Sequence, residues 1–93
     1  PDKIYIYQNY PNPFNAETLV RYELPKEEDV SINIYDIMGR EIYSVSYIKQ
    51  PAGINNFSWK GNNMVGELVS SGMYFLKIKA GNYHKRMKMI LLK

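Results

Sequence analysis

A short segment near the N-terminus, Asn9–Asn15 (NYPNPFN), constrains the fold more than any other part of the sequence. Each of its two prolines lacks a backbone N–H donor, fixes its own φ and holds the preceding residue in extended geometry. The segment is therefore predicted to be a stiff, irregular crossing. Asn15 is suited to close it, because asparagine bonds nearby backbone and tolerates the left-handed region. We expect Tyr10 and Phe14 to pack onto the edge of the domain. The alternative is a proline-rich linker between domains, against which the alternating segments that follow directly argue.

Period-two alternation of apolar and polar residues runs through most of the remaining chain and is typical of half-buried β-strands. Turn-forming residues separate the alternating segments. Ile42 and Val45 lie three positions apart, which breaks the alternation in one segment and predicts a β-bulge there. The predicted strands cover residues 4–7, 18–24, 30–34, 42–47, 74–79 and 86–91, together with a strand that carries Phe57 and Trp59.

The connections between these segments also carry structural information. Asp36–Gly39 predicts a hairpin turn, because aspartate favours the first turn position and glycine adopts a positive φ. Ala80–Asn82 predicts a second hairpin. Lys26–Asp29 is predicted to be a charged, solvated turn. Lys60–Gly72 is the one long irregular stretch and is expected to cross between two sheets.

Short strands, turns at this spacing and the lack of a helical period predict an all-β protein. The expected architecture is an immunoglobulin- or fibronectin III-like antiparallel β-sandwich of about seven strands. A chain of 93 residues is long enough for one domain, predicted over residues 1–93, with residues 1–7 as an edge strand or the end of an upstream linker. Trp59, the single tryptophan, is the best candidate for the centre of the core. No signal-like segment opens the chain, so we expect a C-terminal piece of a longer protein.

Positive charge is concentrated towards the C-terminus. Residues 1–67 hold six Lys/Arg and nine Asp/Glu, a balance of −3, whereas residues 68–93 hold six Lys/Arg and no acid, a balance of +6. Such an end can meet an acidic protein surface, an anionic glycolipid or nucleic acid. The alternative is a solvated strand face whose lysines deter aggregation.

The residues do not suggest catalysis, and no cofactor or metal is expected. His84, the only histidine, lies beside two cations and has no evident nucleophile near it. Glu27–Asp29 lacks the alternating oxygen ligands of a calcium loop, and the absence of cysteine excludes disulfides and thiolate ligands. Nine tyrosines leave sugar stacking open, but they are spread along the chain, and nucleic acid is not expected as a partner.

Several stretches, in order, resemble one known family. Gln8–Asn15 and the alternating strand up to Pro25 match its opening, and Ile34–Asp36 with Gly39–Arg40 match its middle hairpin. The further matches are Ala52–Gly53, Trp59, Gly61, Ser71–Phe75 and Lys88–Lys93. Over about residues 8–93 the chain resembles the type A C-terminal sorting domain of the type IX (Por) secretion system. That family is closely related to the immunoglobulin-like domain of the flagellar hook-capping protein.

Two positions depart from the family pattern. Ala16 stands where a third proline is common, and Lys60 stands where an acidic or amide residue usually follows the tryptophan. Neither position lies in the C-terminal strands.

The resemblance implies that the domain ends a larger secreted protein of a Gram-negative bacterium. It would direct this cargo through the periplasm and the outer-membrane type IX translocon to the cell surface or the medium. A sortase-like peptidase is then expected to remove the domain and join the cargo to an anionic lipopolysaccharide. Recognition in the family concentrates near the C-terminus, which leads us to expect docking of the last hairpin by edge pairing, with lysines selecting an acidic partner. Weak self-association through the last strand is compatible with this.

The residues expected to carry recognition are Gly72, Tyr74, Lys85, Arg86, Lys88 and Lys93. The residues expected to support the fold are Pro11, Pro13, Phe14, Asp36, Gly39 and Trp59. The alternative function is a structural or carbohydrate-binding accessory module of an extracellular enzyme, which would present an exposed row of aromatic rings.

Overall fold

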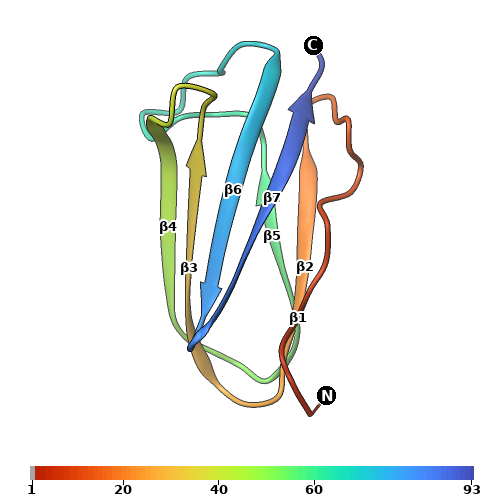
Figure 1. The fold of residues 1–93 in the computed structure, drawn as a ribbon, viewed down its shortest axis with the longest axis vertical. Helices are drawn as coiled ribbons and strands as arrows, with labels where there is room; N and C mark the ends of the chain where they lie inside the picture. The colour runs from red at the N-terminus through yellow and green to blue at the C-terminus, as the bar shows by residue number, and fades with distance from the viewer. Residues whose placement is uncertain (1) are drawn as a thin grey trace.

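Two antiparallel β-sheets pack face to face in the computed structural model, which describes residues 2–93 (Figure 1). These residues form seven strands and no helix, which confirms the predicted all-β sandwich. Pro1, the first residue of the predicted domain, lies outside the described residues. One sheet has the strand order β1-β2-β5 and the other β4-β3-β6-β7. The strands are β1 (Tyr5–Ile6), β2 (Thr18–Leu24), β3 (Glu28–Tyr35), β4 (Glu41–Gln50), β5 (Gly53–Trp59), β6 (Gly72–Ala80) and β7 (Tyr83–Leu91).

The predicted alternation decides which side chains enter the core. In β2, β3, β6 and the end of β7, every second residue is buried and its neighbours are more exposed. Trp59 is 1% exposed and lies at the centre, where its ring is 5.6 Å from that of Phe14 and 5.4 Å from that of Tyr74. The expectation that Trp59 forms the middle of the core is therefore confirmed.

The predicted turns form where the sequence places them. Gly39 has a φ of 82°, and its N–H donates to the Asp36 carbonyl oxygen at 3.0 Å. The Asp36 carboxylate accepts the N–H groups of Met38 and Arg40 and pairs with the Arg40 guanidinium at 2.9 Å. β6 and β7 are joined by the short turn that begins after Ala80. The stretch before Gly72 crosses from one sheet to the other, as expected.

β3 begins within the segment predicted as a charged turn, and its pairing with β4 is irregular. The segment predicted as a charged turn ends earlier than expected, because Glu28 and Asp29 already belong to β3. Glu28 is the Cα partner of Gln50, and the Asp29 carboxylate accepts the Lys49 N–H at 2.9 Å, so both residues are bonded to β4. The predicted bulge is confirmed, since the β3–β4 register shifts between Ile34 and Tyr35.

The proline crossing between β1 and β2 buries Phe14 but not Tyr10. Phe14 is 1% exposed, as predicted, whereas Tyr10 is 80% exposed, so the prediction for Tyr10 is wrong. The cause is backbone pairing: Tyr10 forms an antiparallel bridge with Leu19. Directly opposed residues point to the same face of a sheet, and Leu19 lies on the outer face of β2.

Asn9 takes the buried position at the start of the crossing and is 2% exposed. Its Nδ2 donates to Thr18 Oγ1 at 3.0 Å, and Thr18 Oγ1 donates to the Pro11 carbonyl oxygen at 2.8 Å. The positive φ falls on Ala16, at 79°, and not on Asn15 as expected. A proline could not adopt that φ, so the chain here takes a course that the common third proline of the resembled family would not allow.

The crossing also covers part of the outer edge of β7. The Ile90 N–H donates to Asn12 Oδ1 at 2.9 Å, and the Ile90 carbonyl oxygen accepts the Phe14 N–H at 2.8 Å. The Leu92 N–H donates to the Phe14 carbonyl oxygen at 2.9 Å, and the Lys88 carbonyl oxygen accepts the Asn12 side-chain amide at 3.2 Å. The terminal half of the last strand is therefore already paired within the domain.

Candidate recognition surface on β6 and β7

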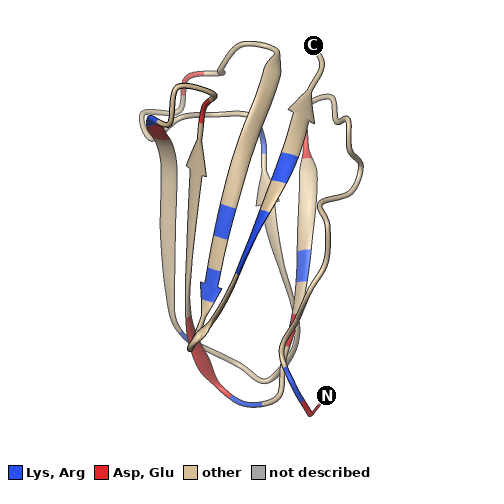
Figure 2. Ribbon diagram, viewed as in Figure 1, with Lys and Arg blue, Asp and Glu red and all other residues tan. Residues whose placement is uncertain are grey.

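Cations occupy adjacent register positions on the outer face of β6 and β7. Lys77 is the Cα partner of Arg86, and Phe75 is the partner of Lys88. These side chains point away from the core, because the residues between them are the buried ones. Figure 2 shows the resulting blue segments along both strands. We define the cationic face as Lys77, Lys79, Arg86 and Lys88.

No carboxylate of the described residues forms an ion pair with the cationic face. Within residues 2–93 the ion pairs are Arg21–Glu23 and Arg40–Asp36, and neither includes a residue of this face. Like charges placed directly opposite each other on a sheet destabilise the pairing of the strands. The juxtaposition of Lys77 with Arg86 is therefore unfavourable in isolation and would be relieved by an anionic partner.

A shallow groove of about 350 Å³ lies beside these cations. Tyr35 and Phe75, which are cross-strand partners, line this groove together with Lys77 and Arg86. Its one carboxylate, that of Asp36, is already held by Arg40. The groove thus combines aromatic surface with cations whose charge is uncompensated, which suits an acidic segment that also carries an apolar side chain.

The structure separates the charged residues that the sequence nominated for recognition. Arg86 and Lys88 lie on the cationic face and are exposed. Lys85 belongs to the alternate position, and its Nζ donates to the Ile6 carbonyl oxygen at 2.9 Å. Lys93 follows β7, and its backbone N–H donates to Ser71 Oγ at 3.0 Å.

The remaining two nominated residues have structural surroundings. Tyr74 is 5% exposed, contacts Trp59 edge-on, and donates its hydroxyl to the Ser70 carbonyl oxygen at 2.6 Å. Gly72 is exposed and begins β6. A partner that docks on the surface can therefore reach Gly72 directly, but Tyr74 only through the residues around it.

Lys77 and Lys79 were not nominated from the sequence, although they complete the cationic face. The signal was present in the hairpin: a tight turn after Ala80 fixes the register, and that register sets Lys77 beside Arg86. Counting outward from the turn would have found both lysines.

Edge pairing by the last strand, expected from the sequence, has little room. The Ile90 N–H points away from β6 and donates to Asn12. Because backbone groups alternate in direction along an antiparallel ladder, those of His84, Arg86 and Lys88 also point away from β6. The crossing occupies this edge from the Lys88 carbonyl group onward. A partner strand could reach only the short part of the edge near the turn.

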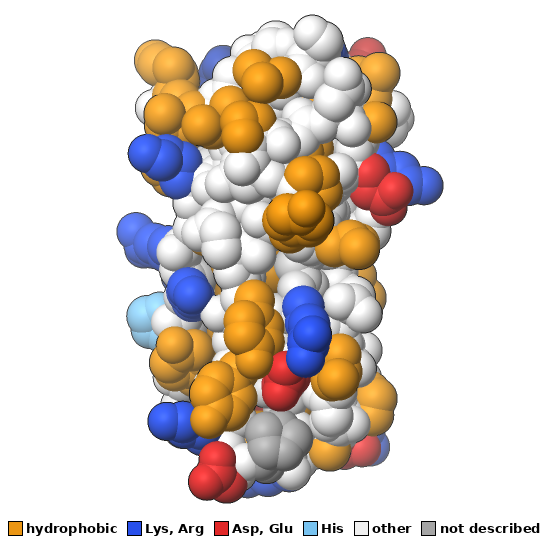
Figure 3. Space-filling model, turned by 90° about the vertical axis from the view of Figure 1, so that its right-hand side faces the viewer, with side chains coloured by type: hydrophobic (Ala, Val, Ile, Leu, Met, Phe, Trp, Pro, Cys, Tyr) orange, Lys and Arg blue, Asp and Glu red, His pale blue; other side chains and the backbone are white. Residues whose placement is uncertain are grey.

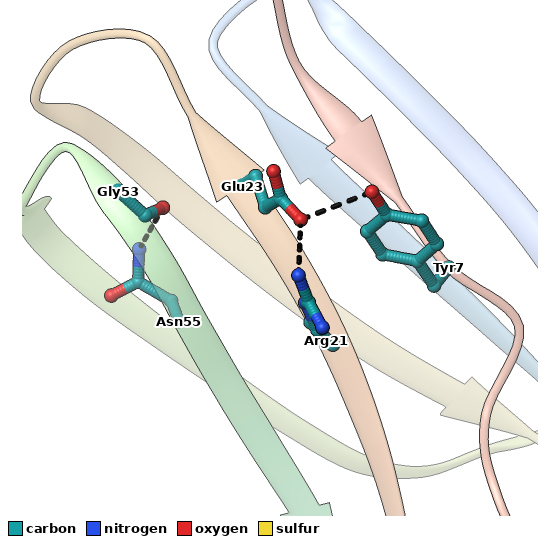
Figure 4. A network of polar contacts seen from close by, with 5 residues as sticks. All are labelled: Tyr7, Arg21, Glu23, Gly53 and Asn55. Atoms are coloured by element: carbon teal, nitrogen blue, oxygen red, sulfur yellow. Dashed lines mark hydrogen bonds and ion pairs between the residues drawn. The ribbon is translucent and has the colours of Figure 1, made fainter. Parts of the chain in front are cut away.

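Three exposed tyrosines lie on or next to the opposite sheet, and a fourth, Tyr83, begins β7 and is 46% exposed. Tyr5, Tyr7 and Tyr10 are 37%, 42% and 80% exposed. Tyr7 is held in a polar network, since its hydroxyl donates to Glu23 at 3.0 Å and the Arg21 guanidinium lies 5.2 Å from its ring centroid (Figure 4). Hydrogen bonding to Glu23, with smaller contributions from burial and charge, raises the pKa of Tyr7. On the side drawn in Figure 3 the hydrophobic side chains form separate groups with charged side chains between them.

Among residues 2–93, no group of three or more His, Cys, Asp or Glu side chains is arranged to hold a metal ion. The part of the chain that the structure describes also contains no helix long and apolar enough to span a membrane.

Comparison with known proteins identifies a family and several structures of the same fold. Residues 12–83 match the family model of the FlgD Ig-like domain. Dimeric latent PorU from Porphyromonas gingivalis is 21% identical with a TM-score of 0.69, and the match covers 96% of this chain but only 9% of that one. FlgD from P. aeruginosa is 20% identical with a TM-score of 0.64, covering 94% of this chain and 67% of that one. FlgD from Xanthomonas campestris, described for hook capping in flagellar assembly, is 16% identical with a TM-score of 0.64, covering 95% and 64%. No curated protein sequence matches the chain.

Proposed function

The chain belongs to the family of FlgD Ig-like domains, and from this premise we propose that it is a non-catalytic sorting domain for type IX secretion. Its cationic face would direct an attached cargo protein to an acidic surface of the outer-membrane translocon. The observation that carries the proposal is the Lys77–Arg86 pair, which sets two like charges opposite each other with no carboxylate between them. An acidic binding partner would supply the carboxylates that neutralise these two cations.

Three further observations support the sorting role. The motifs from Gln8 to Lys93 resemble type IX sorting domains along nearly the whole chain. The fold is similar to that of a part of PorU that makes up 9% of its chain, and the name of that protein shares the Por designation of the secretion system in the resembled family. The end of β7 is also hydrogen-bonded to the proline crossing, so that a partner binds a folded surface and not an unpaired C-terminal segment.

Docking is proposed to use the outer face of β6 and β7 more than their edge. An acidic segment would lie along the groove beside Phe75, with its carboxylates against Lys77 and Arg86. Long-range attraction of this kind mainly accelerates encounter and selects the partner, and it weakens as salt is added. The cargo would reach the cell surface or the medium, where a sortase-like peptidase removes the domain and an anionic lipopolysaccharide receives the cargo.

The accessory carbohydrate-binding module is not favoured by the family to which the chain belongs. The tyrosine at the centre of the exposed set, Tyr7, is also engaged by Arg21 and Glu23.

The test is export of a fluorescent reporter fused ahead of residues 1–93 in a host with a working type IX system. The test variant replaces Lys77, Lys79, Arg86 and Lys88 with glutamate. The matched control makes the same charge change away from this face, at Lys3, Lys26, Lys49 and Lys60. Truncation after Gly81 is a poor test, because it removes Met87, Met89 and Leu91 from the core and would unfold the domain.

We expect the intact fusion and the control variant to be exported and the test variant to accumulate in the periplasm in folded form. Circular dichroism of the purified domains establishes that all of them fold. Retention of the intact fusion in the periplasm would overturn the sorting function. Equal export of the test and control variants would overturn the role of the cationic face.

A further inference from the structure

The outermost strand on the other side of the same sheet, β4, has a sequence with mirror symmetry. Residues 41–49 read EIYSVSYIK, so that identical residues flank Val45 on both sides and only the ends differ, as Glu41 and Lys49. β4 is the edge strand opposite β7, and among the strands that the structure describes it pairs with β3 alone (Figure 1). We propose that two copies of this chain pair through β4, antiparallel and about a two-fold axis at Val45. This inference does not depend on the proposed secretion function.

The side of β4 that faces away from β3 carries backbone groups that no other strand of residues 2–93 uses. Ser44 and Val45 are the Cα partners of Asn33 and Ile32 in β3, but the Ser44 N–H points away from β3 and donates to Met64 Sδ at 3.3 Å. A thioether is a weak acceptor. Because backbone groups alternate along an antiparallel strand, those of Ser46 point outward together with those of Ser44.

Pairing about Val45 uses these groups reciprocally. Ser44 of one copy lies opposite Ser46 of the second copy, and each donates its N–H to the carbonyl oxygen of the other. Val45 lies opposite Val45 of the second copy, at the closer spacing of a non-hydrogen-bonded pair. The exposed Met64 side chain, which is 63% exposed, can move aside for the stronger acceptor.

The ends of the segment select the antiparallel orientation. Antiparallel pairing brings Glu41 of one copy towards Lys49 of the other, whereas parallel pairing would bring like charges together. Register shifts relative to β3 near Glu41–Tyr43 and beyond Tyr47 limit the regular ladder to Tyr43–Tyr47. The long side chains of Glu41 and Lys49 then meet across the irregular ends, and the short ladder predicts a weak dimer.

The inward side chains of β4 are left partly uncovered in a single copy. Tyr43, Val45 and Tyr47 are half-buried, whereas Val30 and Ile32 in the neighbouring strand are 1% and 0% exposed. The β4 strand of a second copy would cover these half-buried side chains and continue the sheet across both copies. The contact is isologous and occupies the β4 edge of each copy, so it closes as a dimer and does not propagate.

The experiment is sedimentation equilibrium of the 93-residue chain over a wide concentration range. We expect a monomer–dimer equilibrium with a dissociation constant between about 1 μM and 1 mM. Ser46→Pro removes an outward N–H that β3 does not use and should raise the dissociation constant about tenfold or more. Arg86→Pro makes the same change at the free part of the β7 edge and should leave the constant unchanged.

A charge exchange provides a second test that leaves the backbone untouched. Glu41→Lys alone should weaken the dimer several-fold, and Glu41→Lys combined with Lys49→Glu should restore it. Circular dichroism of each variant checks that it folds. A wild-type chain that stays monomeric throughout the range overturns the proposal. So does a dimer that is lost in Arg86→Pro but kept in Ser46→Pro, because that result assigns the contact to β7.

Discussion

Phe14 and Leu91 lie side by side in a parallel bridge, although the first belongs to the proline crossing and the second ends the last strand. The Phe14 N–H donates to the Ile90 carbonyl oxygen at 2.8 Å, and the Phe14 carbonyl oxygen accepts the Leu92 N–H at 2.9 Å. The crossing therefore acts as a partial strand on β7. It closes much of the β7 edge and leaves Arg86 and Lys88 of the cationic face exposed.

Amide hydrogen exchange should divide β7 into two parts. The N–H groups of Ile90 and Leu92 are bonded to the crossing and should exchange slowly, whereas those of His84 and Arg86 should exchange fast. Phe14→Ala should accelerate exchange at Ile90 and Leu92 ahead of the strand interior. Equal exchange along the whole edge, measured by NMR, would show that the crossing does not pair with β7 in solution.

Thr18→Val should destabilise the fold although it preserves the shape of the side chain. The Thr18 hydroxyl accepts from Asn9 and donates to the Pro11 carbonyl oxygen inside the domain. Its loss leaves buried polar groups without partners, which costs about 1–3 kcal/mol. Urea denaturation measures the change, and Thr18→Ser, which keeps the hydroxyl, is the control and should lose less.

Trp59→Ala should be among the most damaging single changes. Trp59 is 1% exposed and touches both Phe14 and Tyr74, so truncation leaves a large cavity and costs about 3–5 kcal/mol. Tyr74→Phe, which removes only the hydroxyl bond to Ser70, should cost about 0.5–1.5 kcal/mol. Comparable losses in the two variants would contradict the central position of Trp59.

Acid should weaken the hairpin after β3. Desolvation by itself would raise the pKa of Asp36, but hydrogen bonds from Arg40 and Met38 outweigh it and lower the pKa below 3.8. A depressed folded pKa means that the ionised group stabilises the fold above the unfolded value and that this contribution disappears as the pH falls through the folded value.

Asp36→Asn isolates that contribution. The wild-type chain should be the more stable of the two at neutral pH, and the difference should shrink below pH 3.8. Urea midpoints at both pH values measure it. A difference that is independent of pH would show that the carboxylate charge has no part in holding the turn.

Tyr22 should resist titration until the domain unfolds. Burial of its hydroxyl, with a smaller contribution from Tyr47, raises the pKa of Tyr22 to about 12. A raised folded pKa favours the neutral form, so the contribution to stability is complete below the unfolded value of 10.0 and is lost as the pH rises through about 12.

Tyrosinate absorbance followed together with circular dichroism checks this expectation. Tyr22→Phe should remove one late-titrating tyrosine and flatten the alkaline loss of stability. Its hydroxyl bond to Gln50, at 2.6 Å, is lost as well, so the variant starts from a lower stability at neutral pH. Early titration of Tyr22 in the folded chain would contradict its burial.

Local sequence pattern was enough to predict much of this fold. The alternation in β2, β3, β6 and β7 has the period of a strand with one buried face, and it identified the inward residues correctly. Asp36 and Gly39 carry their turn chemistry within one hairpin. The prediction that Trp59 lies at the centre of the core required only the size of its side chain and its position on an alternating strand.

The directions in which the side chains of Asn9 and Tyr10 point depend on pairing with β2, the next strand along the chain. Both lie in an irregular segment without a period, and pairing with Leu19 turned Tyr10 outward while Thr18 received Asn9. A favourable φ for Asn15 could not reveal that the chain would reverse at Ala16.

For the two candidate surfaces, too, some features follow from the sequence and others only from the tertiary structure. The sequence by itself determined that the C-terminal end is cationic and that residues 41–49 are symmetric about Val45. Only the tertiary structure decided that Lys77 faces Arg86, that β4 remains at an edge and that the crossing covers the end of β7. The physical reason is that composition and alternation are local properties of a chain. Strand order and edge coverage instead depend on contacts between segments far apart in the sequence.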